Sequence, residues 1–244
     1  MIRKILQLFY TTYALLAFVI CFMATYPFNF IASLFSSVAS KRAINMGIRL
    51  SFTTWSWLTG MPLWVRNKTA KGRYIYIANH ASYIDDINIF PAIKGHFRPL
   101  GKKEMTKVPI WGYLYKHVVI VVDRKSPESR AASMAAMAHT LATEGSILIF
   151  PEGTFNATDR PLKDFYDGAF RLAIDTGTPI VPIIFPDAEK RAPHTAWWKI
   201  WPGRNRAFHL APIHVNGMTT DDLPALKAHA YSIMEKELLR HARQ

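Results

Sequence analysis

The chain has 244 residues, of which 50% are hydrophobic and 19% are charged, so it is long enough to bury a sizeable core. One cysteine, Cys21, excludes an intrachain disulfide framework and a cysteine-based zinc cluster. The 30 Lys and Arg against 17 Asp and Glu give a net charge of +13, which favours anionic partners: nucleic acid, acidic lipid, a polyphosphate cofactor or an acidic carrier protein.

The N-terminus carries the longest uncharged run of the sequence, residues 5–40. A membrane-spanning helix needs about 20 apolar residues, so this run is longer than one span requires. Pro27 removes a backbone donor and disfavours a helical conformation at the preceding residue, which predicts two pieces, Ile5–Thr25 and Phe28–Ser40. The first piece is long enough to cross a bilayer, and the second is too short.

Basic residues flank this run, with Arg3 and Lys4 before it and Lys41 and Arg42 after it. The positive-inside rule therefore favours a re-entrant helical hairpin with both ends on the cytoplasmic side of the inner membrane. A single membrane span is an alternative. A cleaved signal peptide is another, although the run exceeds the usual apolar core of a signal and shows no clear small-residue cleavage site.

Three tryptophans, Trp55, Trp57 and Trp64, lie in the next stretch, residues 50–65. Tryptophan prefers the boundary between lipid and water, so we expect this stretch to lie against the headgroups unless it forms an ordinary core helix. The pattern changes at about residue 67. We therefore divide the chain into N-terminal membrane-associated helices, residues 1–66, and a second domain, residues 67–244.

From residue 67 onward, short apolar runs alternate with helical patterns, which is typical of an α/β domain. Several runs are continuously apolar, as in strands buried on both faces. These features predict a mixed, mostly buried β-sheet flanked by helices, with the membrane-embedded helical hairpin at the N-terminus. The expected strands are residues 74–79, 117–123, 146–151, 179–185 and 208–215. The expected helices are residues 127–144 with Ser126 as N-cap, 167–176 ending at Gly177, and 221–240.

The loop after the first of these strands reads N-H-A-S-Y-I-D-D and places His80 five residues before Asp85. On one regular helix the two side chains would point to different faces, so they meet only if His80 precedes a helix and Asp85 lies in its first turns. A carboxylate on one imidazole nitrogen then fixes the tautomer and leaves the other nitrogen to accept a proton. The spacing alone is equally compatible with a hydrogen-bonded structural histidine.

The loop that follows the expected strand 146–151 reads F-P-E-G-T, residues 150–154, and presents Glu152 at the carboxyl end of a buried strand, where α/β proteins form ligand sites. Glu152 could accept hydrogen bonds from a substrate hydroxyl, or it could be a solvated turn carboxylate. The remaining histidines show no metal-ligand spacing such as H-E-x-x-H, so we expect no metal and no resident cofactor.

In combination, these loops resemble the glycerolipid acyltransferases, specifically the 1-acylglycerol-3-phosphate acyltransferases. The family carries H-x-x-x-x-D, then a Lys-x-Glu pair and an Asp-Arg, then F-P-E-G-T and a V-P-I strand. These blocks occur here in the family's order, and the resemblance covers most of the chain after residue 70. The matching residues are His80 and Asp85, Lys102 and Glu104, Asp123 and Arg124, residues 150–154, and Val181, Pro182 and Ile183.

The resemblance implies an enzyme that moves a fatty acyl chain from an acyl carrier protein (acyl-ACP) or from acyl-CoA to the free hydroxyl of a lysophospholipid, foremost lysophosphatidate. His80 would be the general base for this hydroxyl, and Asp85 would orient His80. Direct transfer agrees with the lack of a G-x-S-x-G nucleophile motif. The implied substrate contacts are Glu152, Gly153 and Thr154 for the glycerol backbone, Arg124, Lys102 and Lys103 for the phosphate, and Val181 and Pro182 on the acyl-donor side.

Two departures from the family pattern remove positive charge from the expected phosphate pocket. The family has Arg directly after E-G-T, where this chain has Phe155, and a Lys before Gly168, where this chain has Tyr166 and Asp167. Either nearby cations compensate, or the acceptor lacks a phosphomonoester, as a lyso-ornithine or lyso-glycine lipid does. The nearby cations are Arg160, Lys163 and Arg171.

Residues 193–206 interleave tryptophans with Lys and Arg, which suits either anionic headgroups or stacked nucleic-acid bases. The uncharged N-terminal run favours lipid. We therefore expect the bilayer, a lysophospholipid and an acyl thioester carrier as partners, and no nucleic acid. Two other classes stay open: a basic nucleic-acid-binding protein, and a membrane adaptor that keeps the fold without turnover.

Overall fold

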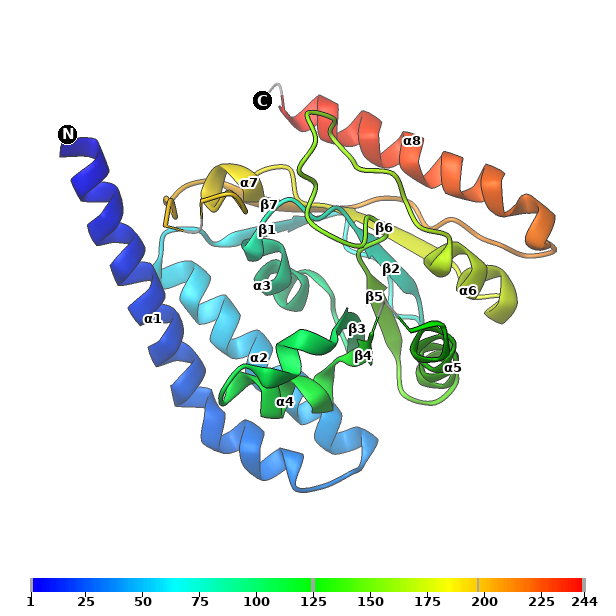
Figure 1. Cartoon of the computed structure of the whole chain (residues 1–244), viewed down its shortest axis with the longest axis horizontal. Helices are drawn as coiled ribbons and strands as arrows, with labels where there is room; N and C mark the ends of the chain where they lie inside the picture. Colours follow the sequence, from blue (N-terminus) through cyan, green and yellow to red (C-terminus); the bar gives the residue numbers. More distant parts are fainter. Residues whose placement is uncertain (1, 124–125, 197, 243–244) are drawn as a thin grey trace.

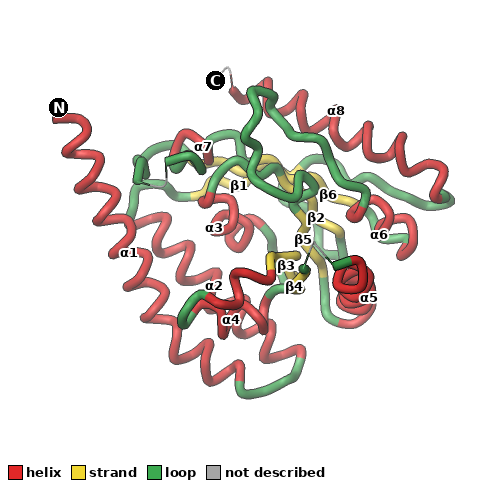
Figure 2. The backbone as a smooth tube through the Cα atoms, viewed as in Figure 1, coloured by secondary structure: helices red, strands yellow, loops and turns green. Residues whose placement is uncertain are grey.

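The computed structural model describes residues 2–123, 126–196 and 198–242, and a seven-stranded sheet forms its centre (Figures 1 and 2). The strand order is β1-β7-β6-β2-β5-β3-β4, and all neighbours run parallel except β6 and β7. The strands are β1 (Leu63–Arg66), β2 (Ile75–Ala78), β3 (Phe97–Lys102), β4 (Ile120–Val122), β5 (Ser146–Ile149), β6 (Ile180–Ile184) and β7 (Asn205–His209). The predicted mixed α/β fold is confirmed.

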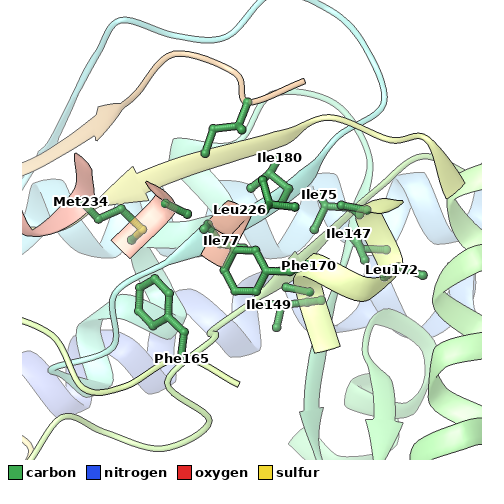
Figure 3. Packing of buried hydrophobic residues seen from close by; sticks show 14 of the residues in the cluster. Ile75, Ile77, Ile147, Ile149, Phe165, Phe170, Leu172, Ile180, Leu226 and Met234 are labelled. Carbon is green, nitrogen blue, oxygen red and sulfur yellow. The ribbon is translucent and has the colours of Figure 1, made fainter. Parts of the chain in front are cut away.

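Two helical layers enclose the sheet. Successive side chains of a strand point to opposite faces, and apolar side chains on both faces of the sheet need covering. Ile75 and Ile77 of β2 pack with α5, α6 and α8, whereas Tyr76 and Ala78 pack with α2, α3 and α4. Figure 3 shows the first of these clusters, with Phe170 of α6 among the strand isoleucines. The helices are α1 (Ile2–Ser33), α2 (Val38–Leu58), α3 (Tyr83–Ala92), α4 (Trp111–Val118), α5 (Pro127–Thr143), α6 (Gly168–Thr176), α7 (Ala188–Arg191) and α8 (Leu223–Ala242), with 3-10 turns η1 (Lys103–Lys107) and η2 (Thr220–Asp222).

Most expected elements are present, with shifted ends. Residues 117 and 118 close α4, so β4 starts later than predicted, and β7 starts and ends earlier. The caps of α5 and α6 are confirmed: the Ser126 hydroxyl accepts the N–H of Ser129 at 3.1 Å, and Gly177 ends α6 with φ +63°. The strands β1 and β3 were not predicted.

The N-terminal hairpin is present, but its predicted break at Pro27 is wrong. Helix α1 runs through Pro27 to Ser33, and the turn lies at residues 34–37, where Ser37 caps α2. Proline is tolerated inside an apolar helix where packing and nearby hydroxyls support the backbone, and here the Thr25 hydroxyl donates to the Phe22 carbonyl at 3.2 Å, one residue before the Met23 carbonyl that Pro27 leaves without its helical donor. The second arm is therefore α2, not the predicted residues 28–40.

The two arms have different surroundings. Lys4–Ser33 is the one helix in the described part of the chain that is long and apolar enough to cross a membrane, and many of its large side chains are exposed. Helix α2 instead buries Ile44, Ile48 and Phe52 against the sheet. The arms touch closely at Gly47, where any Cβ would overlap the buried Asn29 side chain.

The tryptophans of residues 50–65 separate into two groups. Trp55 is buried, and its indole N–H donates to the Ala14 carbonyl at 2.8 Å, so it joins α2 to α1 instead of facing headgroups. Trp57 and Trp64 are exposed. Strand β1 lies before the predicted division at residue 67 yet pairs with β7 in the sheet, while the division itself stays a prediction.

Candidate active site

The carboxyl ends of β2, β3 and β5 lie at one edge of the sheet, because these strands are parallel. The N-H-A-S-Y-I-D loop follows β2 and leads into α3, whose N-cap is Ser82. Asp85 lies in the first turn of α3, and its Oδ2 atom accepts the backbone N–H groups of Ala81 at 2.7 Å and Ser82 at 2.8 Å. This capping box positions a buried carboxylate beside the residue two positions before the N-cap.

That residue is His80, whose Nδ1 lies 3.4 Å from Asp85 Oδ2. The pair thus meets across the start of a helix, as the spacing required. If Nδ1 carries the proton toward Asp85, the second ring nitrogen, Nε2, is the atom that can take a proton from a substrate. Two rings cover the imidazole: Phe150 stacks on it with centroids 4.0 Å apart, and Phe155 lies at 4.2 Å.

Glu152 of the F-P-E-G-T loop is fully buried and ties three segments together. Its Oε1 accepts the His80 N–H at 2.8 Å, and its Oε2 accepts the Lys163 N–H at 2.9 Å. The tight turn that follows needs Gly153, whose φ is +73°. Thr154 is the exposed member of the motif. Glu152 thus fixes the loop that holds His80, and its predicted contact with substrate stays a prediction.

Both buried carboxyls have raised pKa values. Burial raises the pKa of Asp85 to about 8, although the backbone N–H groups of Ser82 and Ala81 act in the opposite direction. Burial likewise raises the pKa of Glu152 to about 7, against the hydrogen bonds from Lys163 and His80, and the nearby Asp85 raises it further. A positive charge that forms on His80 during a reaction would act against this burial and favour the ionised form of Asp85, because the two groups lie within ion-pair distance.

The expected phosphate-binding residues are spread over three segments. Lys102 ends β3, and Lys103 begins η1 with its ammonium 3.4 Å from Asp123 Oδ2. Arg124 lies outside the described residues. Lys102 and Lys103 are at the same sheet edge as His80, since β3 runs parallel to β5.

The residues predicted on the acyl-donor side, Val181 and Pro182, lie within β6 beside β2. Both are buried in the centre of the sheet. Their influence on a substrate would therefore be indirect, through the strand that carries His80 at its end. The donor-side assignment stays a prediction.

Two groups around His80, His194 and Asn79, were not foreseen. His194 stacks on Phe155 at 5.4 Å, and its Nδ1 lies 3.2 Å from the Ala81 carbonyl oxygen. Asn79 accepts the Phe185 N–H at 2.7 Å and thereby joins the ends of β2 and β6. The two aromatic residues that flank P-E-G-T, Phe150 and Phe155, could have indicated the ring contacts with His80. In contrast, nothing in the sequence placed His194 near the site.

Among the described residues, no group of three or more His, Cys, Asp or Glu side chains could hold a metal ion. The polar groups at this edge include the imidazoles of His80 and His194, the buried carboxyls of Asp85 and Glu152, and the nearby lysines. This set suits proton transfer beside an anionic substrate.

Comparisons with known proteins agree with these motifs. A sequence model described as Acyltransferase matches residues 65–186, which include every motif block. A 1-acyl-sn-glycerol-3-phosphate acyltransferase from Haemophilus influenzae is 32% identical over 168 residues, which is 68% of this chain and 68% of the relative. Similar proteins named for the same activity come from sheep, at 32% identity over 63% of this chain and 53% of the relative, and from Cocos nucifera, at 32% identity over 72% of this chain and 56% of the relative.

A solved structure has the same fold. The crystal structure of the 1-acyl-sn-glycerophosphate acyltransferase from Thermotoga maritima matches with a TM-score of 0.76 at 17% identity, and it covers 100% of this chain and 98% of the other. The alignment thus includes the N-terminal hairpin as well as the sheet. From the matching family model and the relatives of more than 30% identity, this chain belongs to the acyltransferase family and is an acyltransferase enzyme.

Proposed function

We propose that this enzyme transfers a fatty acyl chain from an acyl thioester to the free hydroxyl of 1-acylglycerol-3-phosphate, which gives phosphatidic acid. The observation that carries the proposal is the His80–Asp85 pair, with Nδ1 and Oδ2 3.4 Å apart, at the sheet edge of a chain from this family. The activity for which the relatives are named supports the same acceptor.

The reaction needs one proton carrier. The acceptor hydroxyl oxygen attacks the thioester carbonyl carbon while its proton moves to His80 Nε2. The carbon–sulfur bond then breaks, and the same proton passes from His80 to the leaving thiolate. Asp85 stabilises the imidazolium that exists between these steps, and no covalent acyl-enzyme is required.

The acyl donor is either acyl-ACP or acyl-CoA. Both are anionic, and the net charge of +13 supports binding of either one. We propose no resident cofactor, since the thioester is itself a substrate.

The enzyme would act at the cytoplasmic face of the inner membrane. Membrane contact is supported by α1, whose exposed side chains include Phe9, Ile20 and Ile31. So many exposed apolar groups are unfavourable in water and suit a lipid environment. Trp57 and Trp64 are also exposed and suit the boundary of a bilayer. Contact through α1 would bring a lipid acceptor to the domain without its extraction into water.

An acceptor without a phosphomonoester is the alternative substrate, because the apolar ring of Phe155 occupies the position where the family has Arg. The test supplies the purified enzyme with one acyl thioester and either lysophosphatidate, monoacylglycerol or a lyso-ornithine lipid, and identifies products by mass. We expect phosphatidate as the main product, and none with His80→Ala. Exclusive acylation of an acceptor without a phosphomonoester would overturn the proposal.

A further inference from the structure

The missing arginine after E-G-T raises the question of which cation stands in for it. Three cations follow within a short distance in sequence: Arg160, Lys163 and Arg171. The structure separates them. Arg160 is exposed and forms an ion pair with Asp164 at 3.0 Å, and Arg171 lies on the exposed side of α6. Lys163 alone of the three contacts the motif, because its Nζ lies 2.9 Å from Thr154 Oγ1.

Lys163 is held firmly at this position. Its backbone N–H donates to Glu152 Oε2 at 2.9 Å, while Glu152 Oε1 accepts the N–H of His80. One buried carboxylate therefore fixes the backbones of the lysine and of the histidine relative to each other. Leu162 and Phe165 on either side of Lys163 are buried in the core, which anchors the segment.

The charge of Lys163 is available to a ligand. An ammonium has three N–H donors, and the Thr154 hydroxyl uses one. Within residues 2–123, 126–196 and 198–242, Lys163 forms no ion pair, whereas Lys103 lies 3.4 Å from Asp123. Since Thr154 is exposed at the same sheet edge as His80, the ammonium lies where the headgroup of an acceptor would be bound.

We propose that Lys163 binds the phosphomonoester of the acceptor in this chain, in place of the arginine that the family carries at position 155. The two tasks of the loop are then divided. Phe155 covers the His80 imidazole and stacks on His194, and Lys163 supplies the charge. This inference rests on the proposed function, since it assigns a residue that recognises lysophosphatidate.

The test measures steady-state kinetics of the full-length enzyme with lysophosphatidate and with monoacylglycerol, the same acceptor without phosphate. Lys163→Gln is compared with Arg160→Gln, a matched change in the same loop. For Lys163→Gln we expect KM for lysophosphatidate to rise on the order of tenfold, with kcat within about threefold, because a charge-assisted contact made in the ground state is lost. Activity on monoacylglycerol should be unchanged, Arg160→Gln should match the wild type, and Lys163→Arg should restore most of the lost affinity.

A second measurement needs no turnover of the phosphate probe itself. Glycerol 3-phosphate carries the same phosphomonoester, and its inhibition constant should rise in Lys163→Gln and in Thr154→Val, which removes the hydroxyl that holds the ammonium. Equal KM values and inhibition constants in Lys163→Gln and the wild type would overturn the assignment while phosphatidate formation still stood. Equal losses in Lys163→Gln and Arg160→Gln would overturn it too, since only general positive charge would then matter. If the wild type made no phosphatidate, the proposed function would fail before the role of Lys163 arose.

Discussion

Two buried carboxylate sites lie at opposite ends of strand β5, and their surroundings differ. Asp85 and Glu152, at the carboxyl end, accept hydrogen bonds from backbone amides, and burial raises their pKa values. Glu144, just before β5, lies 2.6 Å from the Lys41 ammonium, 3.7 Å from His96 and 3.8 Å from Arg98. Burial alone would raise the pKa of Glu144, but the Lys41 hydrogen bond and the nearby cations lower it below its usual value.

The difference separates a structural ion cluster from a site prepared for reaction. At Glu144 the positive charge is permanent, and it joins α2 to the sheet through Lys41. At Asp85 the group within ion-pair distance, among the described residues, is His80. When His80 takes up a proton, as the proposed reaction requires, its positive charge favours the ionised form of Asp85 and balances that charge.

Removal of the imidazole should have the largest effect. We expect His80→Ala to lower kcat by about 10²- to 10⁴-fold, because the general base is lost. The protein should stay folded, since the backbone contact of His80 to Glu152 is kept and the expected loss of stability is that of the ring contacts with Phe150 and Phe155. The measurement is acyl transfer to lysophosphatidate by folded protein in vesicles. Activity within tenfold of the wild type would contradict the general-base role.

The raised pKa of Asp85 should appear in the pH dependence of stability. A carboxyl with a raised folded-state pKa adds stability below its unfolded pKa, near 4, and this stability is lost as pH rises toward about 8. In Asp85→Asn we expect the loss of unfolding free energy between pH 5 and pH 8 to be smaller than in the wild type by about 2–4 kcal/mol, because one pKa unit corresponds to about 1.4 kcal/mol. Denaturant unfolding at both pH values checks this, and parallel pH profiles would contradict it.

A comparison of the strands shows why part of the fold could be predicted from the sequence. The strands β2, β5 and β6 are continuous apolar runs because both of their faces are buried, so their pattern is local. Strand β3 contains Arg98, Pro99 and Gly101 and looks unlike a strand, yet it lies between β5 and β4. Its pairing depends on tertiary contacts such as that of Arg98 with Glu144, which no local pattern reveals.

The candidate site was predictable to a similar extent. His80 and Asp85 are close in sequence and meet at the start of one helix, so their spacing carried the information. The contacts of His194 with Phe155, and of Lys41 with Glu144, join distant parts of the chain. Pro27 led to a wrong prediction, because a local rule about helix breaking did not hold in α1, which continues through Pro27 and packs along α2.

Disruption of the ion cluster around Glu144 should lower stability and leave activity nearly unchanged, which is the reverse of the effect expected for His80→Ala. We expect Glu144→Gln to lower the free energy of unfolding at pH 7 by about 2–3 kcal/mol, since Lys41 and Arg98 lose their carboxylate but are partly solvated. The kcat of folded protein should remain within about twofold of the wild type. Denaturant unfolding and the acyl-transfer assay measure the two effects. A large loss of kcat without a loss of stability would show that the cluster takes part in the reaction.

An exposed ion pair should contribute least to the free energy of unfolding. Lys227 of α8 lies 2.5 Å from the Asp167 carboxylate beside α6, but both side chains are well exposed, at 33% and 61%. Water and salt screen such a pair, so we expect Lys227→Gln to change the free energy of unfolding by about 0.5 kcal/mol or less, and less still at high salt. Denaturant unfolding at low and high ionic strength checks this. A loss as large as that of Glu144→Gln would mean that short distance, and not burial, determines the strength of ion pairs in this protein.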